Sequence, residues 1–248
     1  MWPYPKVIAH RGGGTLSPEN TLAAMQCGLD YGFAAVEFDV MLSKDGVPVL
    51  MHDPQFGRTI KGTGSVATSM AADLQKMDAG SWFSEQFIGE PVPTYEEAVL
   101  FCRKHGIWMN VEIKPAPGFE QETGRVVAEL TAALFTDVSV TDIEHLPLFS
   151  SFEFTALMAA KLAVPHIPRG FLMDEINSEW RSQMQELAAS AVHTNHKYLN
   201  PEMARQIKDA GYGLFCYTVN TQERAREILS WGVDGFCTDR IDLIPADF

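Results

Sequence analysis

The sequence has few basic residues, no closely spaced cysteines and no long apolar run. Its 19 lysines and arginines are outnumbered by 32 aspartates and glutamates, which gives a net charge of −13. A chain this acidic is not expected to bind nucleic acid or an anionic membrane surface by general electrostatic attraction. An anionic ligand would therefore need a locally positive site, made by a metal ion or by a few placed basic side chains.

The cysteines are far apart and none belongs to a Cys-x-x-Cys pair; they are Cys27, Cys102, Cys216 and Cys237. We therefore expect reduced core residues in a cytoplasmic protein. No signal peptide is expected, because Pro3 and Pro5 interrupt any early apolar run and the first predicted strand begins at Lys6. No stretch is long and apolar enough to span a bilayer.

Strand-like runs alternate with helical patterns along most of the 248 residues. The runs cover residues 6–11, 35–42, 108–114, 146–152, 168–173, 191–199, 213–220 and 235–239, and the extended run 48–52 is counted with the second. Eight βα repeats predict an α/β fold, a closed (β/α)8 or TIM barrel, formed by one domain over residues 1–248. A Rossmann-type sheet would have a G-x-G-x-x-G turn, and Gly12-Gly13-Gly14 has the wrong spacing for it.

The alternation lapses between residues 54 and 93, where glycine, serine and threonine are mixed with Trp82, Phe83 and Phe87. We interpret this segment as an insertion after the second strand with a small apolar cluster of its own. It follows His52 directly, so we expect it to lie over the barrel mouth and to shape the binding site.

Two helix starts are marked by capping residues. The first helix is expected over residues 21–31 with Asn20 as its N-cap. A later helix is expected to begin after Thr94, which forms a capping box with Glu97, and to run to His105.

Polar side chains gather where the first predicted strands end. In a TIM barrel the active site lies at the C-terminal ends of the strands. Residues two apart in a strand point to the same side, so Glu37 and Asp39 project together, as do Glu112 and Lys114. The other polar strand ends are His10-Arg11 and His52-Asp53.

The acidic residues among these predict a divalent cation. Adjacent carboxylates that face inward repel each other and lose hydration unless something neutralises them. The set Glu37, Asp39 and Glu112 suits a hard ion, so Mg²⁺ or Ca²⁺ fits better than Zn²⁺, which favours nitrogen and sulfur ligands. The alternative is an internal salt-bridge network with Arg11 and Lys114.

The two histidines at strand ends, His10 and His52, suit a proton-transfer pair, because imidazole titrates near neutrality. Which of them accepts a proton and which donates one cannot be read from the sequence. His193 and His196 lie on the predicted sixth strand, where one of the two can face the pocket.

Taken together, these motifs resemble those of the glycerophosphodiester phosphodiesterases. The resemblance rests on His10-Arg11-Gly12, Pro18-Glu19-Asn20-Thr21, Glu37-x-Asp39, His52-Asp53, Glu112-Ile113-Lys114, Thr218-Val219-Asn220 and Thr238-Asp239, and covers essentially the whole chain. The chain looks most like the cytosolic bacterial members linked to glycerol-3-phosphate uptake.

The resemblance implies a TIM barrel with the insertion after strand two. It also implies hydrolysis of glycerophosphodiesters, such as glycerophosphocholine or glycerophosphoethanolamine, to sn-glycerol 3-phosphate and an alcohol, a step of glycerol and lipid metabolism. It assigns roles to seven residues: metal ligation to Glu37, Asp39 and Glu112, acid–base work to His10 and His52, and phosphate contacts to Arg11 and Lys114.

Two departures from the family pattern touch the pocket wall. Tyr217 stands where members often have Trp, and Ile241 stands where they often have Pro. Both positions bear on how the pocket fits the alcohol group of the substrate.

Two alternative functions would require other sequence features. A secreted phospholipase D of related fold would need a signal peptide and usually disulfides. A catalytically inactive barrel would be expected to have lost a histidine or a carboxylate. The expected partners are small-molecule substrates, and the sequence is compatible with a homo-oligomer. The sequence does not specify the preferred head group of the substrate or the metal ion.

Overall fold

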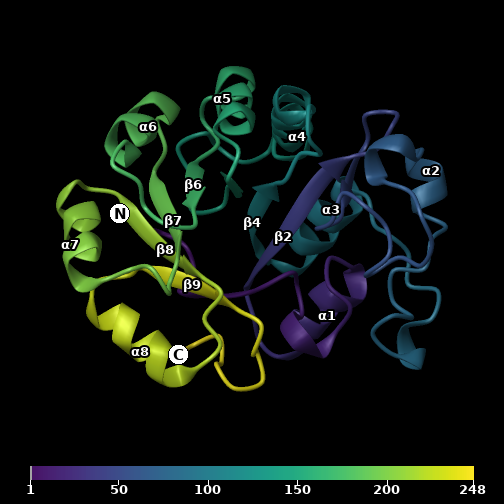
Figure 1. The fold of residues 1–248 in the computed structure, drawn as a ribbon, viewed down its shortest axis with the longest axis horizontal. Coiled ribbons are helices and arrows are strands. Elements are labelled where there is room, and N and C mark those ends of the chain that lie inside the picture. Colours follow the sequence, from purple (N-terminus) through teal and green to yellow (C-terminus); the bar gives the residue numbers. More distant parts are fainter. Residues whose placement is uncertain (1) are drawn as a thin grey trace.

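Eight parallel strands close into a ring in the computed structural model of the chain, which describes residues 2–248. The ring closes where β1 pairs with both β2 and β9, so the TIM barrel predicted from the sequence is confirmed (Figure 1). Its strands are β1 (Val7–Ala9), β2 (Ala35–Leu42), β4 (Trp108–Ile113), β5 (Leu148–Ser151), β6 (Arg169–Met173), β7 (Ala191–Asn195), β8 (Gly213–Tyr217) and β9 (Gly235–Thr238).

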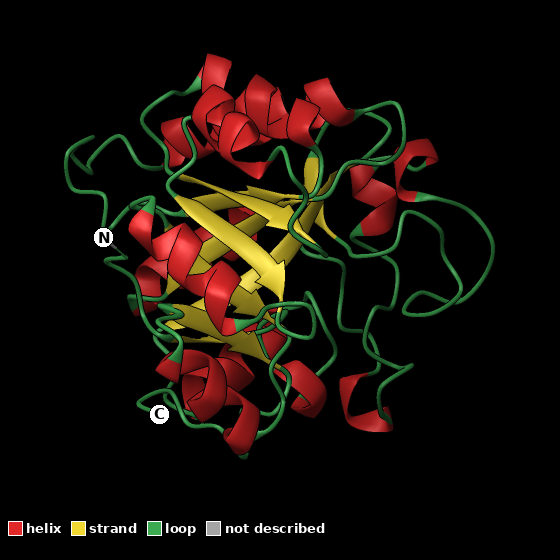
Figure 2. Ribbon diagram, turned by 60° about the vertical axis from the view of Figure 1, so that its left-hand side comes forward, coloured by secondary structure: helices red, strands yellow, loops and turns green. Residues whose placement is uncertain are grey.

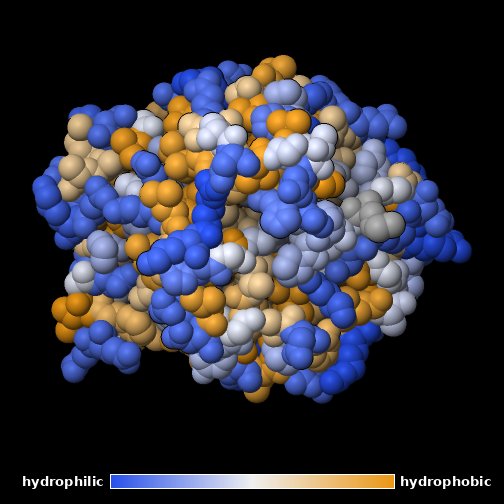
Figure 3. Space-filling model, turned by 180° about the vertical axis from the view of Figure 1, so that it is seen from behind, coloured by the Kyte–Doolittle hydropathy of each residue, from blue (hydrophilic) through white to orange (hydrophobic). Residues whose placement is uncertain are grey.

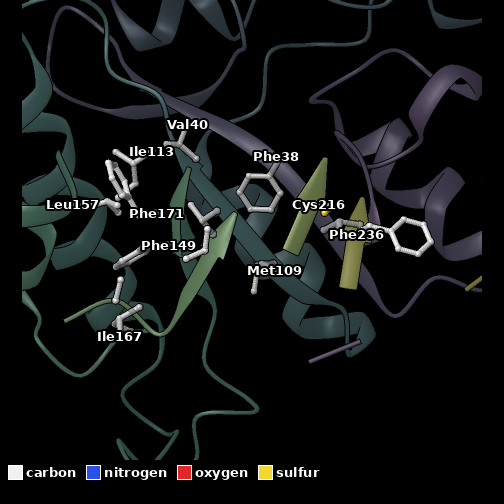
Figure 4. Packing of buried hydrophobic residues seen from close by; sticks show 14 of the residues in the cluster. Phe38, Val40, Met109, Ile113, Phe149, Leu157, Ile167, Phe171, Cys216 and Phe236 are labelled. Carbon is white, nitrogen blue, oxygen red and sulfur yellow. The ribbon is translucent and has the colours of Figure 1, made fainter. Parts of the chain in front are cut away.

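Helices surround the ring, as the view in Figure 2 shows. They are α1 (Leu22–Asp30), α3 (Tyr95–His105), α4 (Glu120–Leu134), α5 (Phe154–Ala163), α6 (Trp180–Leu187), α7 (Pro201–Asp209) and α8 (Gln222–Ser230). The main core lies between strands and helices, where outward-facing residues such as Phe38, Phe149 and Phe171 pack in one buried cluster (Figure 4). Because neighbours alternate along a strand, the acids beside Phe38 on β2 face the barrel interior.

Several strands are shorter than the sequence predicts, because the chain turns where the polar residues begin. The run 191–199 ends at Asn195, whose side-chain and backbone oxygens accept hydrogen bonds from Lys197 and Tyr198. The run 6–11 ends at Ala9, and Arg11 already has a positive φ of 52°. These side chains therefore sit in turns at the barrel mouth.

The first helix begins one residue later than predicted. Thr21, not Asn20, is its N-cap, and its hydroxyl accepts a hydrogen bond from the Ala24 amide. Asn20 instead has a φ of 58° and turns its side chain toward β2. The capping box of Thr94 and Glu97 at the start of α3 is confirmed.

The segment between β2 and α3 lies outside the ring. Strand β3 (Pro48–Leu50) pairs antiparallel with β2, and the short helix α2 (Ala71–Leu74) follows (Figure 1). Val49, Val66 and Leu74 belong to a second buried cluster, which the segment shares with Met41 on β2. Trp82, Phe83 and Phe87 are not part of this cluster and pack edge to face on one another.

On the face shown in Figure 3, hydrophilic and hydrophobic side chains are interspersed. None of the helices between residues 2 and 248 combines the length and the hydrophobicity that a membrane span requires.

Candidate active site

One cavity of about 310 Å³ opens at the C-terminal ends of the strands and brings the predicted site residues together. Six of the seven line it: His10, Arg11, Glu37, His52, Glu112 and Lys114. The seventh, Asp39, lies directly beside them and is in contact with Arg11 and Lys114. Glu37, Asp39 and Glu112 come from β2 and β4, and the other four residues come from the segments that follow β1, β3 (Pro48–Leu50) and β4.

Three largely buried carboxylates meet in this cavity. Glu37, Asp39 and Glu112 offer oxygens that all lie within 4.8 Å of one another. Oε1 of Glu37 and Oε1 of Glu112 have no hydrogen-bond partner among the described residues. Burial, followed by the charge of Asp39, raises the pKa of both glutamates. A crowded set of unpartnered carboxylate oxygens is what a hard divalent cation binds, so these groups could hold a metal.

Arg11 and Lys114 both form ion pairs with Asp39, and Lys114 also forms one with Glu112. Lys114 Nζ lies 3.4 Å from Asp39 Oδ1, and Arg11 Nε lies 3.6 Å from Asp39 Oδ2. Burial acts to raise the pKa of Asp39, but these two cations hold it well below its ordinary value. Lys114 Nζ also forms an ion pair with Glu112 Oε1 at 3.6 Å, which is beyond hydrogen-bond distance. The salt-bridge alternative thus accounts for Asp39 and in part for Glu112, but it leaves Oε1 of both glutamates without a hydrogen bond among the described residues.

The turn after β1 is shaped around the same acids. The backbone amide of Arg11 donates to Glu37 Oε2 at 3.0 Å. Asn20 donates from Nδ2 to Asp39 Oδ2 at 2.8 Å and accepts the Asp39 amide on Oδ1 at 3.0 Å. Asn20 therefore fixes the orientation of Asp39, one of the three predicted metal ligands. The prediction of Asn20 as a helix N-cap did not include this role.

His10 forms a pair with Asp239, which follows β9. Its Nδ1 lies 2.5 Å from Asp239 Oδ1, and its Nε2 is 3.7 Å from Glu37 Oε2. Burial acts to lower the pKa of His10, but the hydrogen bond to Asp239 and the charge of Glu37 outweigh it, so the pKa is raised. Asn220 holds Asp239 by two hydrogen bonds of 2.9 Å each.

His52 has the same arrangement with its neighbour in sequence. Its Nδ1 lies 2.6 Å from Asp53 Oδ1. Burial is the main cause that lowers the pKa of His52, and the charges of Arg11 and Lys114 act in the same direction. In both pairs the aspartate occupies Nδ1, which leaves Nε2 of each imidazole for a ligand.

Arg58, from the segment after β3, connects the carboxylate that holds Arg11 with the carboxylate that holds His52. Its Nη1 and Nη2 donate to the two oxygens of Glu19 at 2.6 and 2.7 Å, and its Nε donates to Asp53 Oδ2 at 2.6 Å. Glu19 in turn accepts from Arg11 Nη1 at 2.8 Å. One guanidinium thereby fixes the partner of His52 and the partner of Arg11 together.

The aromatic residues of this segment do not reach the cavity. Of the described residues 55–93, none lines it. Trp82 and Phe83 pack against each other, so the structure does not support the expectation that they shape the site. The segment contacts the residues of the site through Arg58 instead.

A family model described as the glycerophosphoryl diester phosphodiesterase family matches residues 10–243. The chain belongs to this family. It is therefore a glycerophosphodiester phosphodiesterase.

Relatives cover the whole barrel. The YhdW protein of Bacillus subtilis is 34% identical over 247 residues, which is 97% of both chains. A glycerophosphodiester phosphodiesterase of Caldanaerobacter subterraneus is 32% identical over 238 residues, 94% of this chain and 93% of the relative. An Oleispira antarctica phosphodiesterase, solved in complex with the product sn-glycerol-3-phosphate, is 35% identical with a TM-score of 0.87, covering 95% and 93% of the two chains.

Several site residues of this phosphodiesterase could not be assigned a role in the site from sequence alone. Glu19 and Asp239 lie in the motifs quoted above without a role, and Asn20 is expected there only as a helix cap; their partners are distant in the chain, and only the fold shows them. Arg58 carried no signal beyond its position six residues after His52.

Proposed function

We propose that the chain hydrolyses glycerophosphodiesters to sn-glycerol 3-phosphate and an alcohol, in a reaction that depends on a divalent cation. The observation that carries this proposal is that two histidine–aspartate pairs and two basic side chains face one carboxylate trio in a single cavity. The product found in the Oleispira antarctica structure supports the same substrate class.

Glu37, Asp39 and Glu112 would hold the cation, Mg²⁺ or Ca²⁺. The fit is supported by the unpartnered Oε1 atoms of Glu37 and Glu112, which gain a partner when an ion is present. When bound, such an ion polarises phosphoryl oxygens as a Lewis acid. It also adds the positive charge that a chain of net charge −13 needs to attract an anionic diester.

Arg11 and Lys114 would contact the phosphate. Both cations already lie within 3.6 Å of an Asp39 oxygen, so they are desolvated and held in place before a substrate arrives. An arginine supplies a planar fork of donors, and a lysine a compact charge, which together suit the tetrahedral oxygens of a phosphodiester.

His10 and His52 would move the protons. One imidazole accepts the proton of the attacking hydroxyl, and the other donates a proton to the oxygen of the departing alcohol as its bond to phosphorus breaks. Asp239 and Asp53 hold the two rings through Nδ1 and stabilise the protonated form of each.

The attacking hydroxyl would be the 2-hydroxyl of the substrate's own glycerol. Intramolecular attack gains from proximity, which can lower a barrier by several kcal/mol, up to about 7–11 in the best cases. The alcohol leaves first, and water then opens the cyclic 1,2-phosphate to glycerol 3-phosphate. Because only the shared glycerol reacts in the first step, many alcohol groups can be accepted.

The substrate class is tested by following glycerophosphocholine and glycerophosphoethanolamine by phosphorus NMR with Mg²⁺ or Ca²⁺ present. We expect sn-glycerol 3-phosphate from both. Formation of phosphocholine from the first would mean that the other ester bond breaks, and no turnover of either diester would reject the proposal.

A 2-deoxy analogue of glycerophosphocholine tests the nucleophile. We expect it to bind and to be cleaved at least about a hundredfold more slowly, the low end of what one lost catalytic partner costs. Slow variants should release a cyclic phosphate visible by phosphorus NMR. Normal turnover of the analogue would show that water attacks directly.

A further inference from the structure

Two asparagines hold two aspartates of the site in the same way. Asn20 Nδ2 donates to Asp39 Oδ2 at 2.8 Å, and Asn20 Oδ1 accepts a hydrogen bond from the backbone amide of Asp39 at 3.0 Å. Asn220 makes the same two contacts with Asp239, each at 2.9 Å. Both asparagines precede their aspartates by 19 residues, and neither lines the active-site cavity. We call Asn20–Asp39 the first clamp and Asn220–Asp239 the second clamp.

Each clamp joins the loop after one strand to the next strand of the ring. Asn20 follows β1 and Asp39 lies on β2, whereas Asn220 follows β8 and Asp239 comes directly after β9. The registered backbone pairs between these strands end before either aspartate. The asparagine oxygen therefore serves a backbone N–H that the neighbouring strand does not pair, and the same amide group orients the carboxylate.

The first clamp holds its asparagine in an uncommon backbone conformation. Asn20 has a φ of 58°, in the left-handed region that residues other than glycine rarely adopt. The residue is buried, and it does not cap α1, because Thr21 does so. A backbone of this kind persists only where its surroundings hold it in place. The two hydrogen bonds with Asp39 supply that support.

The two clamped aspartates serve different parts of the site. Asp39 belongs to the carboxylate trio, whose oxygens lie within 4.8 Å of one another. Asp239 lies outside the trio, and its Oδ1 is 2.5 Å from His10 Nδ1. In each clamp the asparagine binds Oδ2 and so fixes where Oδ1 lies.

We propose that the two asparagines are positioning residues with separate effects. Asn20 sets the affinity of the site for a divalent cation through Asp39. Asn220 sets the rate of proton transfer by His10 through Asp239. The inference rests on the function proposed above and adds to it two residues that do not line the cavity.

A neutral amide suits the first clamp. Arg11 and Lys114 also contact Asp39, but their positive charges offset the negative charge that attracts a cation. Asn20 orients the carboxylate and leaves its charge intact. Residues that orient a metal ligand through a hydrogen bond typically contribute about ten- to a hundredfold to metal affinity.

In the second clamp the amide holds the carboxylate against the imidazole. Asn220 donates to one oxygen of Asp239, while His10 occupies the other. Without Asn220 the carboxylate can rotate, and the imidazole loses the contact that orients its ring. Small misplacements of a catalytic group can cost about a hundredfold in rate.

The test separates cation binding from turnover. Binding of Mg²⁺ and of Ca²⁺ is measured by calorimetry on the full chain after removal of metal with EDTA. The kcat for glycerophosphocholine is measured over a range of Mg²⁺ concentrations, and thermal unfolding confirms that each variant is folded.

The variants remove one clamp at a time. Glycine accepts the backbone conformation of residue 20, so Asn20→Gly removes the amide without added strain. Asn220→Ala and Asn220→Ser remove the second amide. Asn200→Ala is the matched control, because Asn200 Oδ1 caps α7 by accepting a hydrogen bond from the Met203 amide at 2.9 Å.

We expect Asn20→Gly to weaken cation binding at least about tenfold, and its activity to be restored by higher Mg²⁺ concentrations. Both Asn220 variants should bind the cation within about twofold of wild type. Their kcat should be at least about tenfold lower at every Mg²⁺ concentration, because no cation replaces the lost contact. Asn200→Ala should match wild type in both measurements.

Two results would overturn the inference alone. One is cation binding by Asn20→Gly equal to that of wild type, and the other is a loss of cation binding in the Asn220 variants as large as in Asn20→Gly. A wild-type protein that binds neither Mg²⁺ nor Ca²⁺ would overturn the metal site of the proposed function as well. Because cation binding is measured without turnover, the two failures are distinguishable.

Discussion

Each of the two proposed catalytic histidines is held by an aspartate, and the two aspartates lie at very different distances from their histidines in the sequence. Asp53 is the next residue after His52, whereas Asp239 is 229 positions away from His10. An aspartate on Nδ1 fixes both the tautomer and the orientation of an imidazole. The proposed proton transfer would therefore depend on the residue that follows β9 as much as on the N-terminal motifs.

Replacing Asp239 by Asn should slow catalysis without unfolding the protein. The amide keeps the shape but removes the charge that stabilises a protonated His10, so we expect kcat to fall about a hundredfold. A steady-state assay with glycerophosphocholine measures this. The control is Asp142→Asn, because Asp142 makes a similar contact of 2.9 Å with His145 on the surface. Equal rates for both variants and wild type would show that Asp239 is only structural.

The charged groups of the site could be predicted because of where the strands end. Glu37, Asp39 and Glu112 alternate with buried apolar residues, and such a pattern places them inside the barrel at its C-terminal face. Their hydrogen-bond partners could not be predicted in the same way. Glu19 with Arg58 and Asn220 with Asp239 are contacts between loops, and loop conformations are not fixed by hydrophobic periodicity.

Among the elements, the inserted segment at residues 54–93 contacts the charged residues of the site through Arg58. Arg58 contacts Glu19 and Asp53 at once, and these residues hold Arg11 and His52. The aromatic residues that make this segment conspicuous in the sequence pack among themselves. Composition therefore predicted that an insertion exists but not which of its residues matters.

Arg58→Ala should lower kcat by about ten- to a hundredfold, because small misplacements of catalytic groups are costly. Arg58→Lys should recover only part of this loss, since one ammonium cannot reproduce a fork that bridges two carboxylates. Arg125→Ala, which breaks a surface pair with Glu129, is the control. An Arg58→Lys variant as active as wild type would contradict this account.

The glycine turn after β1 brings the first loop against the last one. Gly14 has a φ of +55°, and a Cβ there would stand 2.2 Å from the carbonyl oxygen of Asp239. Gly46 also has a positive φ, of +75°, but has no atom within 4 Å of its Cβ position among the described residues. Substitutions at these two glycines therefore distinguish two effects. Both cause backbone strain, but only a side chain at position 14 would also clash with Asp239.

Both Gly14→Ala and Gly46→Ala should lose stability, by about 1–2 kcal/mol from the left-handed backbone alone. Only Gly14→Ala should also displace Asp239 and slow turnover. Denaturant unfolding and kcat are measured on both variants. Equal activity in the two would mean that the contact between Gly14 and Asp239 does not position His10.

At the scale of the whole molecule, an acidic chain must bind an anionic substrate. The chain carries a net charge of −13, yet its proposed substrate is an anion. Arg11, Lys114 and the proposed divalent cation, gathered at one end of the ring, would offset the charge of the three carboxylates there. The same closed ring could be predicted from eight strand-like runs, because eight βα repeats favour a barrel and the chain lacks the G-x-G-x-x-G turn of a Rossmann-type sheet.

The central claim is that Glu37, Asp39 and Glu112 hold a divalent cation on which hydrolysis depends. The most direct measurement is the rate of glycerophosphocholine hydrolysis by protein treated with EDTA, with metal content checked by elemental analysis. We expect the rate to be abolished and then restored by Mg²⁺ or Ca²⁺. Glu112→Gln should need more metal for half-activation, whereas Glu144→Gln, in the exposed acidic group at Asp142 and His145, should behave as wild type. Full activity in protein shown to be free of metal would contradict the account.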